Sequence, residues 1–286
     1  MNVAEHCVAG EDLFDFCLWP YVPPAPVAGK LRPVNILRNA FAVAGLEHQG
    51  DALIGRLRGA FGDSRTVWGI KLEQGRVSWE LYFYDYARLQ RTRSVPGFLA
   101  AVGMDIPGAL PPLEDVPYFM FSVDVDGDLL QGRRTLAELQ IYIGNIGSNV
   151  SSGICYQVTG AATTLRNFYF FFDRAREMED IVGKMSSSMF LQQSALRPEL
   201  LLWPELMDCQ TIVVANKVNR DGLYFSRIKV DQLLYFLRRL DYPAEHVKFI
   251  ERNRGQLDHI LYDVGFDYRM RGGRIEILKS AYYAIF

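Results

Sequence analysis

Cysteine and histidine are scarce in this sequence, and neither is grouped. The four cysteines, Cys7, Cys17, Cys155 and Cys209, lack the close pairing of a zinc site, and the four histidines show no metal-ligand spacing. We therefore expect no metal site and reduced thiols, as in most cytoplasmic proteins.

Long apolar runs and a strong charge of either sign are also missing. No stretch approaches the roughly 20 apolar residues of a membrane-spanning helix. The N-terminus carries Glu5, Glu11 and Asp12 in place of the basic and apolar regions of a signal peptide. The formal net charge is −2, so no overall field attracts nucleic acid or an anionic membrane. We expect a soluble, cytoplasmic monomer that binds neither.

Several motifs of known chemistry fail in detail. Residues 124–128 are similar to a calcium loop, but the glycine is misplaced and the twelfth position is Thr135, so a hairpin turn is favoured. The glycines of residues 144–148 join two expected strands, whereas a dinucleotide-binding loop or a P-loop leads from a strand into a helix. No serine lies in the Gly-x-Ser-x-Gly context of a hydrolase nucleophile.

What the sequence does contain is an alternating aromatic segment at residues 78–86. Large apolar residues alternate with a glutamate and three tyrosines (Trp79, Leu81 and Phe83 against Glu80, Tyr82, Tyr84 and Tyr86). This period of two predicts a β-strand with one apolar face and one face of phenol groups.

The same short phrase, in which a tyrosine follows an apolar residue, returns four times. The copies are Gln140-Ile141-Tyr142-Ile143, Asn167-Phe168-Tyr169-Phe170, Gly222-Leu223-Tyr224-Phe225 and, more loosely, Ala281-Tyr282-Tyr283-Ala284. Such recurrence indicates an internally repeated architecture.

Expected strands and turn residues divide the chain into five hairpins, at residues 66–86, 118–143, 154–172, 211–228 and 262–286. Turn residues include Gly75, the pair Asp221-Gly222 and the pair Gly272-Gly273.

Helical spacing of apolar residues predicts helices between most of the hairpins. They are expected over residues 34–61 (broken near Gly50), 87–102, 174–191 (capped by Asp173), 230–240 and 244–258. Residues 1–33 are rich in proline and are expected to form an extended lead-in.

Ten twisted antiparallel strands rarely remain an open sheet, and closure into a barrel removes the unpaired edges. The apolar strand faces, such as Trp79/Leu81/Phe83 and Phe168/Phe170/Phe172, are expected to lie under helices, and the tyrosine faces to line a lumen. The predicted fold class is therefore α+β: a ten-stranded antiparallel β-barrel of five hairpins, surrounded by α-helices in a helix–helix–strand–strand repeat. We expect residues 1–286 to form a single domain.

This layout resembles the ABBA aromatic prenyltransferases, soluble enzymes built on the PT barrel. The likeness covers the chain after residue 34. Glu80-Leu81-Tyr82-Phe83 resembles a strand of the family's first hairpin, and Met120-Phe121-Ser122-Val123-Asp124 the opening strand of its second. Asn167-Phe168-Tyr169-Phe170 resembles a strand whose Asn and Tyr face the diphosphate. Residues 279–283 resemble the last strand, where a Lys and a Tyr four residues on share the interior face.

The resemblance implies transfer of an allylic isoprenyl group from a prenyl diphosphate to an aromatic acceptor by electrophilic substitution. The acceptor would be an indole or a phenol, free or carried on a peptide. An allylic cation requires aromatic faces and exclusion of water, and the departing diphosphate requires fixed cations. No cofactor is implied beyond the prenyl diphosphate as co-substrate.

The resemblance also implies roles for named residues. Glu80 would accept a hydrogen bond from the N–H or O–H of the acceptor. Five tyrosines would shield the allyl cation: Tyr82, Tyr142, Tyr169, Tyr224 and Tyr283. The diphosphate would be held by Lys71, Asn167, Lys217, Arg269 and Lys279, and we expect the four cations among these to converge on one interior patch.

The sequence departs from the family at several positions. Gln140 and Gly222 stand where relatives place Lys or Arg, and Tyr82 stands where magnesium-dependent members have Asp. We therefore expect activity not to require Mg²⁺, which prefers carboxylate ligands. Two alternatives stay open. One is a non-catalytic barrel protein that binds a hydrophobic or isoprenoid ligand and has no need of the cations. The other is a cofactor-free cyclase or isomerase with Glu80 as its base.

Overall fold

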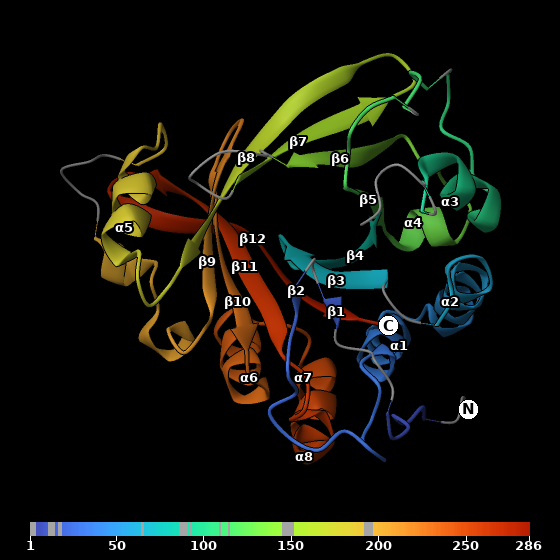
Figure 1. Ribbon diagram of the computed structural model, residues 1–286, viewed down its shortest axis with the longest axis horizontal. Coiled ribbons are helices and arrows are strands. Elements are labelled where there is room, and N and C mark those ends of the chain that lie inside the picture. Colours follow the sequence, from blue (N-terminus) through green and yellow to red (C-terminus); the bar gives the residue numbers. More distant parts are fainter. Residues whose placement is uncertain are drawn as a thin grey trace.

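The computed structural model describes residues 4–10, 15–16, 19–63, 66–85, 91, 93–108, 110–113, 115–144, 152–191 and 197–286. Cys17, Tyr86 and the 145–148 part of the glycine segment, all considered in the sequence, lie outside the described residues. Within them the chain forms a closed barrel of ten antiparallel strands, as predicted (Figure 1).

All five predicted hairpins are present. They are β3 (Thr66–Glu73) with β4 (Arg76–Tyr84), β5 (Met120–Val125) with β6 (Glu138–Gly144), β7 (Ser152–Thr159) with β8 (Thr163–Asp173), β9 (Thr211–Lys217) with β10 (Asp221–Ile228), and β11 (Tyr262–Arg271) with β12 (Arg274–Ile285). Each strand pairs with the next along the chain, and β12 pairs with β3 to close the barrel. Because all neighbours are antiparallel, the five hairpin turns share one end, here called the turn end. The longer connections share the other, the crossover end.

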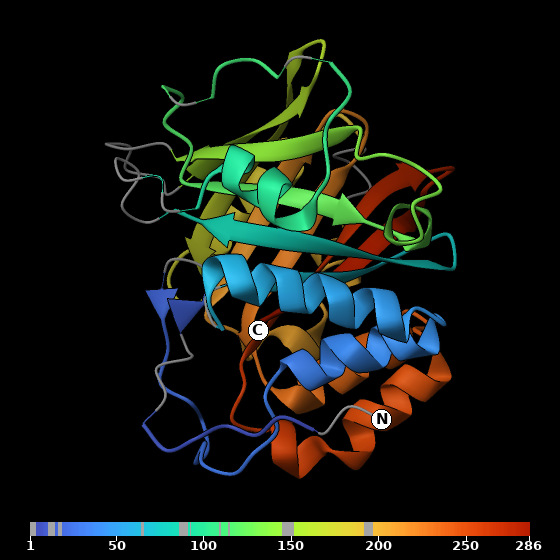
Figure 2. The same ribbon diagram turned by 90° about the vertical axis from the view of Figure 1, so that its right-hand side faces the viewer.

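Helices lie outside this barrel. They are α1 (Val34–Val43), α2 (Glu47–Phe61), α3 (Val95–Val102), α4 (Gly127–Leu130), α5 (Met178–Ser186), α6 (Val230–Arg239), α7 (Ala244–Arg252) and α8 (Arg254–Leu257), with the 3₁₀ turns η2 (Pro198–Leu200) and η3 (Pro204–Leu206). Helices α1 to α3 flank the first two hairpins and α6 to α8 the last two, while α5 contacts β8 and β9 (Figures 1 and 2). None of the described helices is long and apolar enough to cross a membrane.

The outward face of β4 packs under these helices, as its alternation predicted. Trp79 is 1% exposed, and its ring centroid lies 4.4 Å from that of Phe41 on α1. Phe83 is stacked on Phe121 of β5 at 4.8 Å and lies 5.0 Å from Phe98 of α3. Burying rings of this size removes a large apolar area from water, which stabilises the contact between the barrel and its helices.

The outer face of β8 was predicted to be covered in the same way, and for part of it this is wrong. Phe172 is 6% exposed, but Phe168 is 41% exposed and Leu165 likewise. Figure 1 shows no described helix over this part of the β7/β8 hairpin. The alternation in the sequence predicts which residues share a face of the strand. It does not predict which faces are covered by a helix.

Two other local predictions are corrected. The break in the first helical segment falls at residues 44–46, and Gly50 lies inside α2, where a Cβ would be 2.3 Å from Cδ2 of Phe41. Gly50 therefore permits close helix packing and is not a helix stop. The pair Asp221-Gly222 begins β10, so the turn is formed by residues 218–220; Asp221 is held by Asn216 and Ser188.

Two helix ends also differ from prediction. Asp173 was expected to cap a helix over residues 174–191, but its carboxylate accepts from the N–H of Ala175 at 2.8 Å and so caps a turn, and α5 begins only at Met178. The turn expected at residues 124–128 contains α4, whose N-cap Asp126 accepts from the N–H of Leu129 at 2.9 Å.

The lead-in lies across the crossover end. It contains the short pair β1 (Asp15–Phe16) and β2 (Trp19–Pro20), and His6 forms a bridge with Leu31. The Cys7 thiol lies 3.6 Å from Nε2 of His259, and the Tyr21 hydroxyl accepts a hydrogen bond from the N–H of Leu261 at 3.2 Å. The lead-in is therefore fixed to the segment that enters β11.

Candidate active site

A belt of five tyrosines surrounds the middle of the barrel. The residues are Tyr82, Tyr142, Tyr169, Tyr224 and Tyr283, one from the second strand of each hairpin. Consecutive ring centroids lie 5.7 Å (Tyr283–Tyr82), 6.3 Å (Tyr82–Tyr142), 6.1 Å (Tyr142–Tyr169) and 6.3 Å (Tyr169–Tyr224) apart. The repeated sequence phrase therefore corresponds to one repeated position on the barrel wall. We call this set the tyrosine belt.

Glycines on the neighbouring strands make room for two of these rings. Gly69 pairs with Tyr283 and Gly265 with Tyr224 across the sheet. A Cβ at Gly69 would lie 2.6 Å from Cε1 of Tyr283, and one at Gly265 would lie 2.1 Å from Cδ1 of Tyr224. These rings therefore lie flat on the backbone of the next strand, which is the usual reason for a glycine inside a strand.

The belt separates two cavities. A polar cavity of about 340 Å³ lies toward the turn end and a largely apolar one of about 190 Å³ toward the crossover end. The residues that line both are the five belt tyrosines and no other described residue. A molecule that extends from one cavity into the other would thus pass through a ring of phenol faces.

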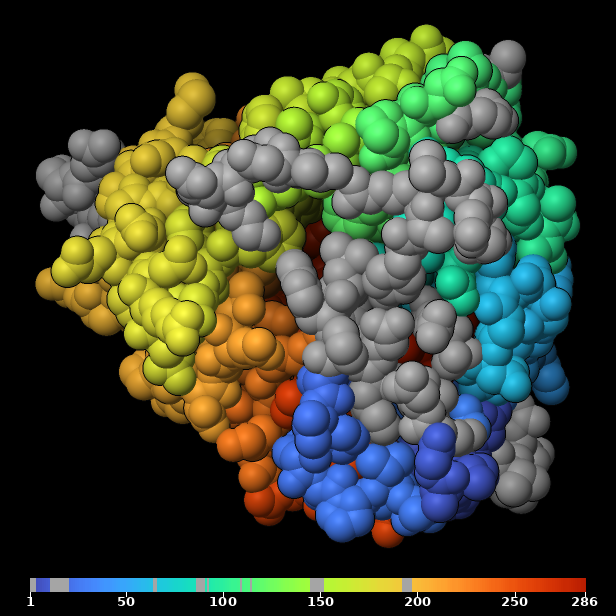
Figure 3. All heavy atoms as spheres, in the orientation of Figure 1, coloured from blue at the N-terminus to red at the C-terminus, as the bar shows by residue number. Residues whose placement is uncertain are grey.

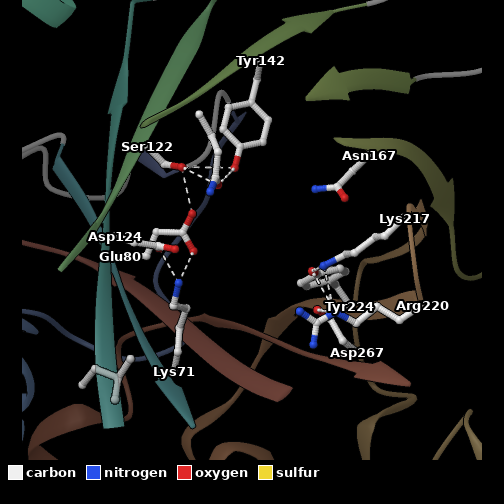
Figure 4. Close-up of polar contacts among 12 residues, drawn as sticks. Lys71, Glu80, Ser122, Asp124, Tyr142, Asn167, Lys217, Arg220, Tyr224 and Asp267 are labelled. Carbon is white, nitrogen blue, oxygen red and sulfur yellow. Dashed lines mark hydrogen bonds and ion pairs between the residues drawn. The ribbon is translucent and has the colours of Figure 1, made fainter. Parts of the chain in front are cut away.

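The polar cavity is crowded with charge but is balanced overall. Among the described residues its walls hold five cations and five carboxylates: Lys71, Arg166, Lys217, Arg220 and Lys279 against Glu73, Glu80, Asp124, Glu138 and Asp267. Six of them form two groups that face each other across the lumen: Lys71, Glu80 and Asp124 on one side, and Lys217, Arg220 and Asp267 on the other (Figure 4).

The first group lies on β3, β4 and β5. The Lys71 ammonium forms ion pairs with Asp124 and, at 3.5 Å, with Glu80. The second oxygen of Glu80 accepts from the Ser122 hydroxyl at 2.8 Å, and that hydroxyl lies 3.2 Å from the hydroxyl of Tyr142. Glu80, 4% exposed, is thereby joined to the tyrosine belt.

The second group lies on β9, β10 and β11. Lys217 Nζ lies 2.6 Å from Asp267 and donates to the Tyr224 hydroxyl at 2.8 Å. Arg220 lies 3.5 Å from the other oxygen of Asp267. Gly222 stands beside them, and a Cβ there would lie 3.0 Å from Asp267 and 3.1 Å from Lys217.

These contacts set the ionisation of the site. Burial alone would raise the pKa of Glu80, but Lys71 and Lys279 and the Ser122 hydrogen bond outweigh it, so the pKa is lowered. Burial likewise disfavours a charged Lys217, yet Asp267 raises its pKa above the usual value. Burial, followed by the nearby Glu80 charge, raises the pKa of Tyr82 well above its usual value. Near neutral pH the carboxylate and the ammonium are therefore ionised and the phenol is neutral.

Lys279 differs from the other two lysines. It lines the same cavity, but within the described part of the chain its ammonium group forms no hydrogen bond or ion pair. Its pKa is lowered, first by burial and then by Lys71. A half-buried ammonium that has no ion-pair partner is costly, and an anion in the cavity would relieve that cost.

The structure thus brings together ten of the eleven site residues singled out from the sequence: the five belt tyrosines with Glu80, Lys71, Asn167, Lys217 and Lys279. Asn167 lines the same polar cavity and donates to the Tyr169 hydroxyl at 3.0 Å.

Arg269 was expected among the converging cations, and this is wrong. It forms an ion pair with Glu276 at 3.0 Å on β12, and both side chains are about 40% exposed (39% and 43%). The strand pairing shifts between Asp267 and Tyr268, so Arg269 lies beyond an irregularity of the ladder and near the hairpin turn.

Sequence reasoning missed Asp267, Ser122 and Arg220 as members of the site. Asp267 had a visible signal, because it is an acidic residue between Phe266 and Tyr268 on a strand whose apolar residues point outward. Asp124 was placed from the sequence only in the opening strand of the second hairpin, and the structure makes it the ion-pair partner of Lys71.

The apolar cavity has a different chemistry. Its walls are formed mainly by Val67, Tyr84, Phe119, Met120, Phe171 and Val213. Figure 3 shows a hollow on this face of the molecule, at the bottom of which atoms of the C-terminal strand are visible in dark red. Such walls suit the hydrocarbon of an isoprenoid or an aromatic ring.

Metal ligands are not gathered in the described ranges: no three histidine, cysteine or carboxylate side chains there are close enough together to hold a metal ion. In comparisons with known proteins, no protein-family model matches the chain, and no curated protein matches its sequence. The assignment of a function therefore depends on the geometry of the two cavities.

Proposed function

We propose that this protein is an aromatic prenyltransferase of the ABBA type, which transfers an allylic group from a prenyl diphosphate to an indole or phenol. The observation that carries the proposal is the tyrosine belt between a cavity that contains ammonium groups and an apolar one. A barrel with helices outside is compatible with the family. Helices α1 and α2 precede the first hairpin, β3 and β4, and a helix–helix–strand–strand repeat along the whole chain belongs to the proposal.

In the proposed reaction the C–O bond of the prenyl diphosphate breaks, and its electron pair leaves with the diphosphate. Lys279, with Lys71 and Lys217, would receive that anion. The allylic cation would lie within the tyrosine belt, whose ring faces stabilise positive charge and whose packing limits access of water. An acceptor atom then forms the new bond to carbon with its own electron pair and loses a proton to the released diphosphate.

Glu80 would orient the acceptor. Its carboxylate is held by Ser122 and Lys71 next to the belt, and its lowered pKa keeps it ionised. An ionised carboxylate accepts a hydrogen bond from an indole N–H or a phenol O–H and raises the electron density of the ring. The same lowered pKa makes Glu80 a weak base, which disfavours the cyclase or isomerase alternative, because that reaction requires abstraction of a proton from carbon.

A second candidate function, a binding protein for a hydrophobic or isoprenoid ligand, is favoured by one observation. The ionisable side chains of the polar cavity balance, and Lys71 and Lys217 both have carboxylate partners. A carrier of a hydrophobic ligand needs no surplus of cations. In a prenyltransferase, the diphosphate would have to compete with Asp124 for Lys71 and with Asp267 for Lys217.

The experiment that separates the two is incubation with dimethylallyl, geranyl or farnesyl diphosphate and a panel of indoles, phenols and aromatic peptides. Mass spectrometry would detect the added isoprenyl group. We expect turnover by the native protein and a loss of about a hundredfold in Glu80→Gln, which preserves shape and removes the charge. Asp231→Asn, a change in an exposed ion pair with Arg254, is the matched control. Binding of the diphosphates without turnover of any pair would support the carrier.

A further inference from the structure

Four exposed arginines lie at the turn end of the barrel, and none of the roles above uses them. They are Arg76 at the start of β4, Arg166 on β8, and Arg271 and Arg274 at the tip of the β11/β12 hairpin. We call these residues the arginine rim. Within the described ranges, none of the four side chains forms a hydrogen bond or an ion pair.

The alternation of β11 places Arg271 on the lumen side of the sheet. Asp267 lines the polar cavity, and Arg269 and Arg271 follow it at intervals of two residues on the same strand. On the opposite face, Met270 packs against the hydrophobic core. Arg274 is the direct cross-strand partner of Arg271, so its side chain lies on the same face. The hairpin tip therefore presents two arginines toward the mouth of the polar cavity.

These two arginines stand directly opposite each other. Like charges in this arrangement destabilise a strand pair. The turn between them is Gly272-Gly273, whose φ values of +58° and +74° close the hairpin in two residues and keep the arginines adjacent. An anion between the two guanidinium groups would remove the repulsion and accept hydrogen bonds from both.

The other two arginines continue the rim around the cavity. Arg76 is the cross-strand partner of Glu73, which lines the cavity, so Arg76 shares its face. Arg166 is the extra residue of a β-bulge in β8, and it lines the cavity itself. Bulges of this kind redirect a side chain.

The described carboxylates at this end already have partners. The pairs are Glu73 with Arg220, Glu276 with Arg269, Asp126 with Arg134, Asp128 with Arg133, Glu138 with the amide of Gln157 and Asp221 with the amide of Asn216. Among the described residues of the turns, the charged groups without a partner are therefore all arginines. This local surplus of positive charge contrasts with the formal net charge of −2 on the whole chain.

We propose that the arginine rim attracts the diphosphate group of the prenyl diphosphate and directs it into the polar cavity. The rim raises the rate of association, and it does not hold the anion once it is bound at Lys279. This assignment rests on the proposed function, because it takes the same diphosphate as its ligand.

Distance separates these two roles. Arg271 lies four residues beyond Asp267, or about 13 Å farther along β11, and Asp267 is the cross-strand partner of Lys279. The Debye length at physiological ionic strength is about 8 Å. An anion at Lys279 is therefore largely screened from the hairpin tip, whereas an anion that enters at the mouth passes close to it. Charges placed in this way change the association rate more than they change the dissociation rate.

The test measures binding of inorganic pyrophosphate, so it needs no acceptor and no turnover. Calorimetry gives Kd, line broadening of the ³¹P NMR signal gives koff, and koff divided by Kd gives kon. In Arg271→Gln/Arg274→Gln at about 0.1 M salt, we expect kon to fall about threefold while koff stays unchanged. The difference should disappear at about 0.5 M salt, where the Debye length is only about 4 Å.

The matched control removes the same charge from the opposite end of the molecule. Arg252→Gln/Arg254→Gln changes two exposed positions in α7 and α8, where the chain approaches the start of β11, and it should bind pyrophosphate as the native protein does. A further variant, Arg271→Glu, places opposite charges across the hairpin tip. It should melt at a slightly higher temperature than the native protein and still bind pyrophosphate more slowly. A merely structural role of Arg271 would not combine a gain in stability with slower association.

Four results would overturn the inference: unchanged kinetics in the rim variant, a loss that appears in koff, an equal loss in the control variant, or no binding of pyrophosphate to the native protein. If pyrophosphate shows the expected pattern but no prenyl diphosphate gives transfer, the arginine rim stands and the proposed function falls. If transfer occurs and kon does not depend on the rim, the proposed function stands and the inference falls.

Discussion

The ring of Tyr224 lies against the backbone of Gly265, at a distance that excludes any side chain. A Cβ at position 265 would lie 2.1 Å from Cδ1 and 2.6 Å from Cγ of that ring. The two residues pair directly across β10 and β11, so neither can move without disturbing the strand ladder. The position of a belt tyrosine is therefore set by the absence of a side chain on the next strand.

Replacing that glycine should displace the ring. We expect Gly265→Ala to destabilise the fold by about 1–3 kcal/mol, the usual cost of overpacking, and to reduce activity further than the stability loss explains. Gly55→Ala is the control, because Gly55 lies in α2 with nothing within 4 Å of the place that a methyl group would occupy, and alanine there should be neutral or stabilising. Chemical denaturation of both variants provides the measurement. A Gly265→Ala protein as stable as the native one would contradict the tight contact.

Replacement of a belt tyrosine should distinguish the ring from the hydroxyl. Tyr169 contacts both neighbouring belt rings, at 6.1 and 6.3 Å, and its hydroxyl accepts from Asn167. We expect Tyr169→Phe to be mild and Tyr169→Ala to lower turnover by about thirtyfold, the equivalent of a desolvated cation–π interaction of about 2 kcal/mol. Equal losses in the two variants would assign the main role to the hydroxyl.

The tyrosine belt could be predicted from the sequence because it depends on local rules. Alternation fixes which side of a strand a residue takes, and the same phrase recurs on the second strand of every hairpin. Glycines within strands, such as Gly69 and Gly265, were also visible and indicate where a neighbour approaches the backbone. The closed barrel follows from the number of strands and from the cost of unpaired edges.

The ion pairs of the polar cavity could not be predicted in the same way. Lys217 and Asp267 are 50 residues apart, and their contact depends on the register of β9 with β10 and of β10 with β11. The pairing shift after Asp267 separates Arg269 from the other cations, and a shift of this kind has no reliable sequence signal. Phe168 is exposed because no described helix packs over its part of β8. The sequence of the strand does not determine where a helix packs.

Turnover should not depend on magnesium. Glu80, Asp124 and Asp267 already form ion pairs with lysines, and Tyr82 stands at the belt where a carboxylate would serve a metal. Mg²⁺ requires oxygen ligands in near-octahedral geometry, and recruiting these carboxylates would break the ion pairs. The measurement is the rate with excess EDTA beside the rate with added Mg²⁺. Full loss on chelation, restored by Mg²⁺, would overturn this expectation.

Acid should destabilise the fold through His246. Its Nδ1 lies 2.7 Å from Oδ1 of Asn39, its Nε2 contacts the Tyr282 hydroxyl, and burial lowers its pKa from 6.5 to about 4. Between these values the unfolded chain binds a proton that the folded chain does not, so stability falls as the pH decreases. At pH 5 the loss should be roughly 2 kcal/mol relative to neutral pH. Urea unfolding of native protein and His246→Gln across this range provides the check. A native curve with the same pH slope as the variant would exclude His246 as the cause.

Binding of an anion in the polar cavity should weaken at alkaline pH through Lys279. Burial and the nearby Lys71 lower the pKa of Lys279 below its usual 10.5, so it loses its proton earlier than an exposed lysine does. Only the charged form attracts a phosphate group. As the pH rises through the lowered pKa, affinity for inorganic pyrophosphate should therefore fall by about tenfold, the weight of one charge-assisted hydrogen bond.

The variants Lys279→Arg and Lys279→Met test this assignment. Arginine remains charged throughout the range, so Lys279→Arg should bind pyrophosphate with a flatter pH profile, whereas Lys279→Met should bind weakly at every pH. Since the ionisation of pyrophosphate itself is common to all three proteins, the difference between their profiles isolates the lysine. The carboxylate partners of Lys71 and Lys217 raise the pKa values of these two lysines, so they would lose their protons only at higher pH than Lys279. An alkaline loss of affinity in Lys279→Arg as large as that of the native protein would therefore show that a group other than Lys279 titrates.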